Sequence, residues 1–208
     1  MMTLDRPTDA LVRFAAAIAE GREPRVADAA EFAWQAGVSV LWGDELVLQS
    51  VLMVGYPRAL SAAAQWRQAT GQPPAAEPAE RRVPSAECRD PSAENRGEAT
   101  CRTIYGANYE KLRNNVAGLH PALDQWMVSE GYGRTLSRPG LDLIRREFCV
   151  IAQVTVLEAE RQLHSHLRGA LNAGADHAAI SAVLDATAGE ASAAGMAMAR
   201  RLWARVTG

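Results

Sequence analysis

Glu147 and His166 are the two residues of this chain whose types and spacing best suit proton-transfer chemistry. They lie nineteen positions apart, with Arg145, Arg146 and Cys149 nearby. A carboxylate that meets an imidazole in an apolar site orients the ring and raises its basicity, so that the pair can move a proton near neutral pH. The alternative is a solvated Glu147 in the first turn of a helix, where the helix dipole favours a negative charge. The sequence alone leaves both interpretations open.

A helix over 160–173 would place only one of two neighbouring histidines beside small residues. Each residue advances about 100° around a helix, so the leucines spaced four apart form the core stripe. His164 then falls at the polar edge of this stripe, whereas His166 falls among alanines and a glutamine. Small neighbours favour either close helix packing or a ligand cavity. Because the two rings point apart on a helix, we expect no metal site here.

The elements that would position these residues are helices throughout. Apolar residues recur every three or four positions and strand signals are nearly absent, which predicts an all-α fold. Asp44 is the expected cap of the third helix, and the segment 70–98, rich in proline and charge, is typical of an extended linker. The predicted helices are 8–20, 25–36, 44–54, 57–69, 97–116, 121–131, 142–157, 160–173, 177–188 and 190–205.

An internal repeat is suggested by an Ala-Gly step that occurs at 36–37 and again at 173–174. The same offset of 137 carries Trp66 onto Trp203. We expect two similar helical units related by a pseudo-twofold, with the segment 97–141 inserted between them. At this offset the Glu–His pair falls on alanines, so each chain would hold at most one site. The expected domains are a degenerate N-terminal repeat (1–69), the linker (70–98) and a C-terminal helical domain (99–208).

Composition excludes several classes of function. The chain has 208 residues, a net charge of −2 and 48% hydrophobic residues, which predicts a substantial core and no electrostatic footprint for nucleic acid. No apolar run approaches the roughly 20 residues of a membrane span, and the N-terminus lacks a signal-peptide pattern, so a cytoplasmic protein is expected. Three cysteines do not form a disulfide framework. We expect Cys149 to be buried and inert, and Cys88 and Cys101 to pair only as a special regulatory case.

Two motifs carry a resemblance to a known family. They are EGYGRTLSRPGLD at 130–142 and HSHLRGALNAG at 164–174, with Arg146-Glu147 between them. Together they resemble the carboxymuconolactone decarboxylase family, which includes the alkylhydroperoxidase D-like proteins. The likeness is best over about 97–190 and extends weakly to the run from Trp42 to Pro57. It implies an all-α fold, a homo-oligomer and a site between helices.

Peroxidase members of this family join Glu and His through the pattern Glu-x11-Cys-x2-Cys-x3-His. Counted from Glu147, this pattern reaches His166 but places Ala159 and Gln162 where the cysteines belong. Without a peroxidatic and a resolving thiol, disulfide-based peroxide reduction is not available. The resemblance therefore favours the decarboxylase branch, which needs neither the cysteine pair nor a cofactor.

In the decarboxylase branch the substrate is a small γ-lactone that bears carboxylates. The resemblance implies His166 as the acid/base, Glu147 as its partner, and substrate contacts from Tyr132, Arg134 and Arg138, since arginine binds carboxylates bidentately. Surface solvation or capping of nearby carbonyls is the alternative role of both arginines. The expected function is a cofactor-free lyase or related enzyme in a homo-oligomer, without nucleic-acid or membrane partners. The alternatives are a non-catalytic helical oligomer that buries the pair as a hydrogen bond and, less favoured, a thiol peroxidase.

Overall fold

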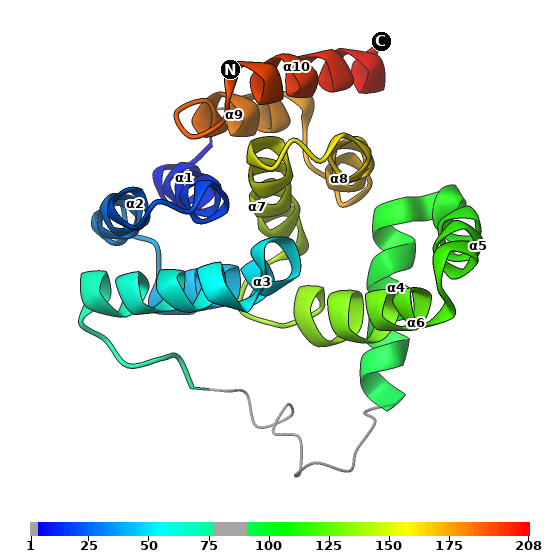
Figure 1. The fold of residues 1–208 in the computed structure, drawn as a ribbon, viewed down its shortest axis with the longest axis horizontal. Helices are drawn as coiled ribbons and strands as arrows, with labels where there is room; N and C mark the ends of the chain where they lie inside the picture. Colours follow the sequence, from blue (N-terminus) through cyan, green and yellow to red (C-terminus); the bar gives the residue numbers. More distant parts are fainter. Residues whose placement is uncertain (1–3, 77–90) are drawn as a thin grey trace.

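A computed structural model describes residues 4–76 and 91–208, and all regular structure in these ranges is helical (Figure 1). The predicted all-α fold class is therefore confirmed. The elements are α1 (Arg6–Glu20), α2 (Glu23–Gln35), α3 (Val40–Thr70), α4 (Pro91–Tyr105), the 3-10 helix η2 (Gly106–Asn108), α5 (Tyr109–Leu119), α6 (Pro121–Trp126), the π-helix η3 (Met127–Leu136), α7 (Leu143–Val156), α8 (Glu160–Asn172), α9 (His177–Thr187) and α10 (Ala193–Thr207).

The main core forms where α1 and α7 pack against each other. Helices α2 and α3 flank α1, and α8, α9 and α10 surround α7 (Figure 1). Both central helices are apolar around most of their circumference, because each is covered on several sides. Burying one large aliphatic or aromatic side chain contributes about 1.5–3 kcal/mol, so this cluster supplies much of the stability of the fold. Its fully buried side chains include Leu11, Phe14, Leu46, Trp66, Ile151, Leu163, Leu167 and Ile180.

Helix boundaries recur along the chain at the offset found in the sequence. Helices α7, α8 and α9 each begin 137 residues after α1, α2 and α3 respectively. Asp5 and Asp142, the N-caps of α1 and α7, are counterparts at this offset, and each accepts a hydrogen bond from the backbone N–H three residues on. Arg145 Nε also donates to Thr8 Oγ1, its own counterpart, at 2.9 Å. Residues at the same place in the two halves are therefore in contact here, while the pseudo-twofold itself stays a prediction.

Helix α3 differs from its prediction at its start and agrees with it in the middle. Ser39 caps it by accepting a hydrogen bond from the backbone N–H of Trp42, so the expected cap at Asp44 is wrong. The Asp44 carboxylate is used elsewhere, because Oδ2 accepts the N–H of Ala75 at 2.7 Å. The break expected near Pro57 is present as a kink at Gly55, whose φ of 71° and ψ of 173° are not helical. The kink separates two arms that the sequence predicted as two helices.

The same helix is the one element of the described ranges that is long and apolar enough to cross a membrane. Length and composition are the only grounds for this, and core helices of soluble proteins share them. Glu45 lies buried within it and is paired with arginines from other elements. This helix therefore adds no membrane assignment by itself.

The inserted helices α4, α5, α6 and η3 form a second, smaller core. Helix α4 begins at Pro91, so the prediction of an extended linker is wrong for 91–98; proline is well tolerated in a first helical turn. Gly97 lies mid-helix, where a Cβ atom would fall 2.1 Å from the Val128 carbonyl oxygen, so this glycine lets α4 and η3 touch backbone to backbone. The rest of the predicted linker, beyond residue 76, lies outside the described residues, as does Cys88.

Candidate functional site

Glu147 of α7 and His166 of α8 meet in the interior. Nδ1 of the imidazole lies 2.9 Å from Oε2 of the carboxylate. Glu147 is 0% exposed and His166 is 6% exposed, so the interpretation of Glu147 as a solvated first-turn charge is wrong. Helix α7 is packed between several others and turns this position inward. Removing a carboxylate from water costs several kcal/mol, which a close partner offsets.

A glycine in α8 allows the inserted helices to close over the pair. A Cβ atom on Gly169 would fall 2.7 Å from Oε2 of Glu147 and 2.6 Å from Cγ2 of Ile104. The end of α4 is held against α8 by Asn172, whose Nδ2 donates to the Ile104 carbonyl at 2.8 Å. The carboxylate therefore lies at the junction of α7, α8 and α4, where the two cores adjoin.

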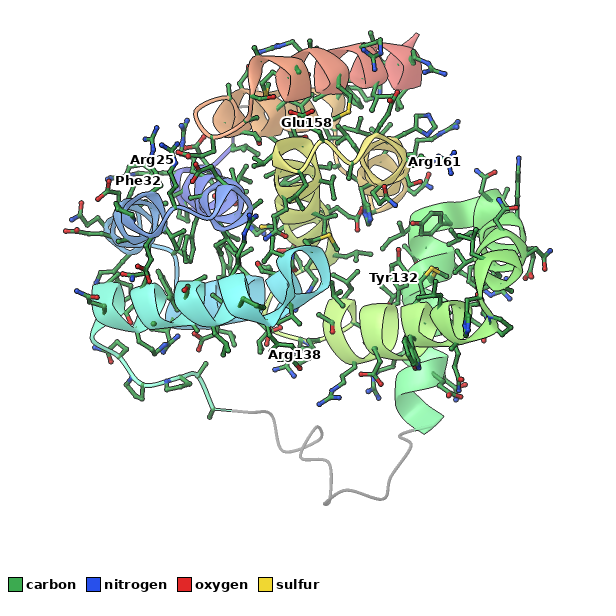
Figure 2. The ribbon with its side chains drawn as sticks, in the orientation of Figure 1. Arg25, Phe32, Tyr132, Arg138, Glu158 and Arg161 are labelled. Carbon is green, nitrogen blue, oxygen red and sulfur yellow. The ribbon has the colours of Figure 1, made fainter. Side chains whose placement is uncertain are left out.

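Two tyrosines of the inserted helices add hydroxyl groups near this junction. The Tyr132 hydroxyl, from η3, donates to the Tyr105 hydroxyl, at the end of α4, at 3.2 Å. Figure 2 shows Tyr132 on the side of these helices that is turned towards α7 and α8. Burial raises the pKa of Tyr105 to about 12, with the Glu147 charge acting in the same direction and a contact with the Ser165 hydroxyl opposing both. Burial likewise raises the pKa of Tyr132, so both phenols stay protonated at neutral pH and can donate hydrogen bonds.

The hydrogen-bonding capacity of the pair is only half used. Oε1 of Glu147 is buried and accepts no hydrogen bond within the described structure. Nε2 of His166 also forms none with the described residues. Buried polar atoms are nearly always satisfied, so the unpartnered Oε1 marks a place where a water or a ligand group would be favourable. When Nδ1–H donates to Glu147, Nε2 carries the lone pair and can act as a base.

The predicted arginine clamp is not at this place. Arg134 is exposed and pairs with Glu130 of its own helix at 3.3 Å. Arg138 pairs with Glu45 of α3 at 3.0 Å, and Figure 2 shows it beside α3 rather than beside Tyr132. Neither ion pair includes a member of the Glu–His pair. Of the three predicted substrate contacts, the structure therefore places only Tyr132 near the junction.

Arg138 belongs instead to a buried ion cluster that joins α7 to α3. Oε2 of Glu45 also accepts a hydrogen bond from Nη2 of Arg146 at 2.7 Å. The Arg146 guanidinium further donates to the side chain of Gln49 and to the carbonyls of Leu141 and Arg138. A buried arginine needs this many acceptors, so the cluster has a structural role.

The thiols of the described residues offer little redox chemistry. Cys101 and Cys149 are both buried and free, so the burial expected for Cys149 is confirmed. Burial raises the pKa of each thiol to about 12, which keeps the reactive thiolate scarce at neutral pH. No group of three or more metal-ligating side chains converges in the described part of the chain.

Comparison with known proteins adds no assignment to this geometry. No protein-family model matches the chain, and no curated protein sequence matches it. The resemblance to the carboxymuconolactone decarboxylase family therefore rests on the residues quoted above and on nothing further.

Proposed function

We propose that this chain is a cofactor-free, carboxymuconolactone decarboxylase-like enzyme that uses Glu147 and His166 for proton transfer on a small lactone. One observation carries the proposal: a buried carboxylate bonded to an imidazole through one oxygen, with its other oxygen unpartnered. A purely structural pair leaves such an atom unsatisfied without benefit. The all-helical fold and the site between helices agree with what the resemblance implies.

The arrangement suits a reaction that passes through a carbanion next to a carbonyl group. When the carbon–carboxylate bond breaks and CO₂ leaves, the electron pair delocalises into the adjacent carbonyl. His166 then delivers a proton to the carbon, and Glu147 stabilises the imidazolium that holds this proton beforehand. The protonated phenol of Tyr105 supplies a hydrogen bond for the developing oxyanion, and Tyr132, which donates to the Tyr105 hydroxyl, orients it. Because the arginines are engaged elsewhere, the proposal rests on proton transfer and not on a carboxylate clamp.

A second candidate, a non-catalytic pair in a helical oligomer, is favoured by one observation. Gly169 and Ile104 close tightly over Oε2 of Glu147, as in a packed core. The raised thiol pKa values and the lack of cysteines at Ala159 and Gln162 count against a thiol peroxidase.

Self-association is part of the proposal. Four large apolar side chains of α3 are at least 38% exposed: Leu48 and Leu52 before the kink at Gly55, and Tyr56 and Leu60 after it. Large apolar side chains that remain exposed are common at interfaces between subunits. We therefore propose a homo-oligomer, to be checked by light scattering. We further propose a cytoplasmic protein without nucleic-acid or membrane partners.

The catalytic proposal is tested by proton transfer itself. We would incubate the protein in D₂O with γ-carboxymuconolactone and with simple γ-lactones, and follow CO₂ loss and deuterium incorporation by NMR. Glu147→Gln and His166→Asn should each lower the rate at least about 100-fold, the range of general acid–base catalysis. Arg134→Ala, on the surface, is the matched control and should leave the rate unchanged.

Turnover that survives both substitutions would sink the acid–base assignment. Absence of turnover in the parent protein, together with a loss of stability in both variants, would instead support the structural candidate. Peroxide consumption that depends on added thiol would revive the peroxidase.

A further inference from the structure

The helices inserted between the two halves have a core of their own. Helices α4 to η3, residues 91–136, form what we call the cover. Figure 1 shows the cover, in green, as a separate group beside α7 and α8. The buried residues of its core are Cys101, Ile104, Tyr109, Tyr132 and Leu136. A segment that packs on itself in this way can move as one cooperative unit.

Charged side chains stabilise the cover from within. Nη2 of Arg113 lies 2.8 Å from Oδ2 of Asp124. Nη2 of Arg102 lies 2.8 Å from Oε1 of Glu98, and the same guanidinium stacks 3.9 Å from the centre of the Tyr109 ring. All five of these residues belong to the cover, so these contacts are kept when the cover moves as a whole.

The chain leaves the cover at a joint between Ser137 and Arg138. Ser137 is bonded to the cover, because its N–H donates to the Tyr132 carbonyl at 2.8 Å and its hydroxyl donates to the Gly133 carbonyl at 2.6 Å. Arg138 is bonded to the main fold, because its carbonyl accepts a hydrogen bond from Nη2 of Arg146 at 3.0 Å. Two neighbouring residues thus belong to different bodies, and hinges are commonly a few residues at the end of an element.

The end of α4 is the part of the cover that hides the Glu147–His166 pair. A Cβ atom on Gly169 would fall 2.6 Å from Cγ2 of Ile104 and 2.7 Å from Oε2 of Glu147, so Ile104 lies directly over the carboxylate. Nδ2 of Asn172 donates to the Ile104 carbonyl at 2.8 Å and holds α4 in this place. Movement of α4 away from α8 would break this bond and uncover the pair.

A ligand needs such a movement to reach the pair. Glu147 is 0% exposed and His166 is 6% exposed, so a molecule in solution has no room beside either side chain. Lids that close over a reacting group and shut out water are common in enzymes, and they open on the microsecond to millisecond timescale.

We propose that the cover is a lid. It turns at the joint between Ser137 and Arg138, separates α4 from α8 and admits a small molecule to His166, and on closing it excludes water from the pair. The hydrogen bond from Asn172 to the Ile104 carbonyl is its latch. The purpose of the lid rests on the proposed proton-transfer function, whereas its opening does not.

The opening is measured in the parent protein without any substrate. Diethyl pyrocarbonate acylates the free nitrogen of a neutral imidazole, and mass spectrometry reads the modification of His166 by itself. Iodoacetamide reports global unfolding through Cys149, which is 0% exposed in the main core. Each rate, divided by the rate in the urea-unfolded protein, gives an open fraction. The open fraction of His166 should exceed that of Cys149 at least about 10-fold and rise less steeply with urea, because an opening lid exposes less surface than unfolding.

Two variants separate lid opening from global unfolding. Asn172→Ala removes a bond that exists only in the closed protein, so it should raise the open fraction of His166 about 5-fold, the effect of one hydrogen bond. Ser181→Ala removes the acceptor of Trp203 in the main fold, a bond that survives lid opening. It should therefore raise the open fraction of Cys149 and leave that of His166 unchanged.

An exposed asparagine of the cover provides the matched control. Asn115→Ala, on α5, should leave both open fractions unchanged. The proposal fails if His166 and Cys149 report the same open fraction in the parent protein, if Ser181→Ala raises both alike, or if Asn172→Ala leaves His166 as protected as before. None of these readings depends on turnover, so the lid and the catalytic proposal can fail separately.

Discussion

The two halves of the molecule, 5–71 and 142–208, share helix boundaries but not chemistry. Where the second half buries Glu147 against His166, the first half has Ala10 and Ala29. The surroundings differ as well. In the second half the inserted helix α4 covers α8. In the first half the residue that corresponds to Gly169 is Phe32 of α2, whose side chain is 41% exposed (Figure 2). The burial of the Glu147–His166 pair therefore depends on Gly169 as well as on the helices, because this glycine lets α4 pack closely against α8.

The halves also differ in how they use a buried tryptophan. Trp203 Nε1 donates to Ser181 Oγ, whereas the indole N–H of Trp66 has no acceptor within the described residues. The two halves therefore carry different side chains on recurring helix boundaries.

The largest expected effect comes from making the second half resemble the first. His166→Ala alone should destabilise the protein by about 3–5 kcal/mol, because it leaves the buried Glu147 carboxylate without its partner. Adding Glu147→Ala should recover part of this loss, because it removes the unpaired carboxylate but leaves a cavity. Urea unfolding of the two single variants and the double variant measures the coupling. Equal destabilisation by His166→Ala and by the double variant would show that the carboxylate is not buried as described.

The glycine that admits α4 gives the next largest effect. Gly169→Ala should cost about 1–3 kcal/mol, because the new methyl group overlaps Glu147 Oε2 and Ile104. Gly118, in α5, is the matched control: nothing lies within 4 Å of a Cβ built there, so Gly118→Ala should stabilise by up to about 1 kcal/mol through helix propensity. The thermal unfolding midpoints of both variants test this prediction. An unchanged midpoint for Gly169→Ala would mean that α4 does not pack closely over the Glu147–His166 pair.

The halves differ in backbone strain at one pair of counterparts. Gly21 has φ 89°, and Glu158, at the offset of 137, has φ 54°. Gly21→Ala should therefore destabilise by about 1–2 kcal/mol, since only glycine adopts this conformation freely. Glu158→Gly should raise the free energy of unfolding by less than about 1 kcal/mol. It relieves the strain of the positive φ but loses the hydrogen bond that Ser192 Oγ donates to the Glu158 carboxylate at 2.6 Å. Unfolding midpoints that move in the same direction in both variants would contradict this account.

Much of this fold could be predicted from the sequence, because helix signals are local. Capping residues, glycines and apolar spacing predict most helices. The offset of 137 in the sequence also matches the distance between the first residues of α1, α2 and α3 and those of α7, α8 and α9. Long-range partners were not predictable in this way. Arg138 resembled a substrate clamp until its contact with Glu45, 93 positions away, was seen. Tyr105 had the spacing of an ordinary core residue, so nothing local marked it as a neighbour of the pair.

The start of α4 and the cap of α3 show a second limit. Pro91 and the charges at 94–98 predict an extended chain, yet the backbone contact of Gly97 with η3 stabilises a helix there. Asp44 has the right chemistry for a cap but is drawn to Arg67 and Ala75. In both cases a tertiary contact outweighs a local preference.

The smallest expected effect on stability at neutral pH comes from the ionisation of one buried thiol in each of the two cores. Cys101 lies in the inserted core and Cys149 in the main core, and burial raises the pKa of both to about 12. Below the unfolded-state pKa of about 9, both thiols are protonated in the folded and the unfolded protein, so they do not change the free energy of unfolding with pH. As the pH rises from about 9 towards 12, only the unfolded protein loses these protons, so the free energy of unfolding falls. At pH 8 both thiols should react with iodoacetamide far more slowly in the folded protein than in urea, as mass spectrometry would show. If Cys101 reacts much faster than Cys149, the inserted core opens independently, and the cover over Glu147 and His166 is the mobile part of the site.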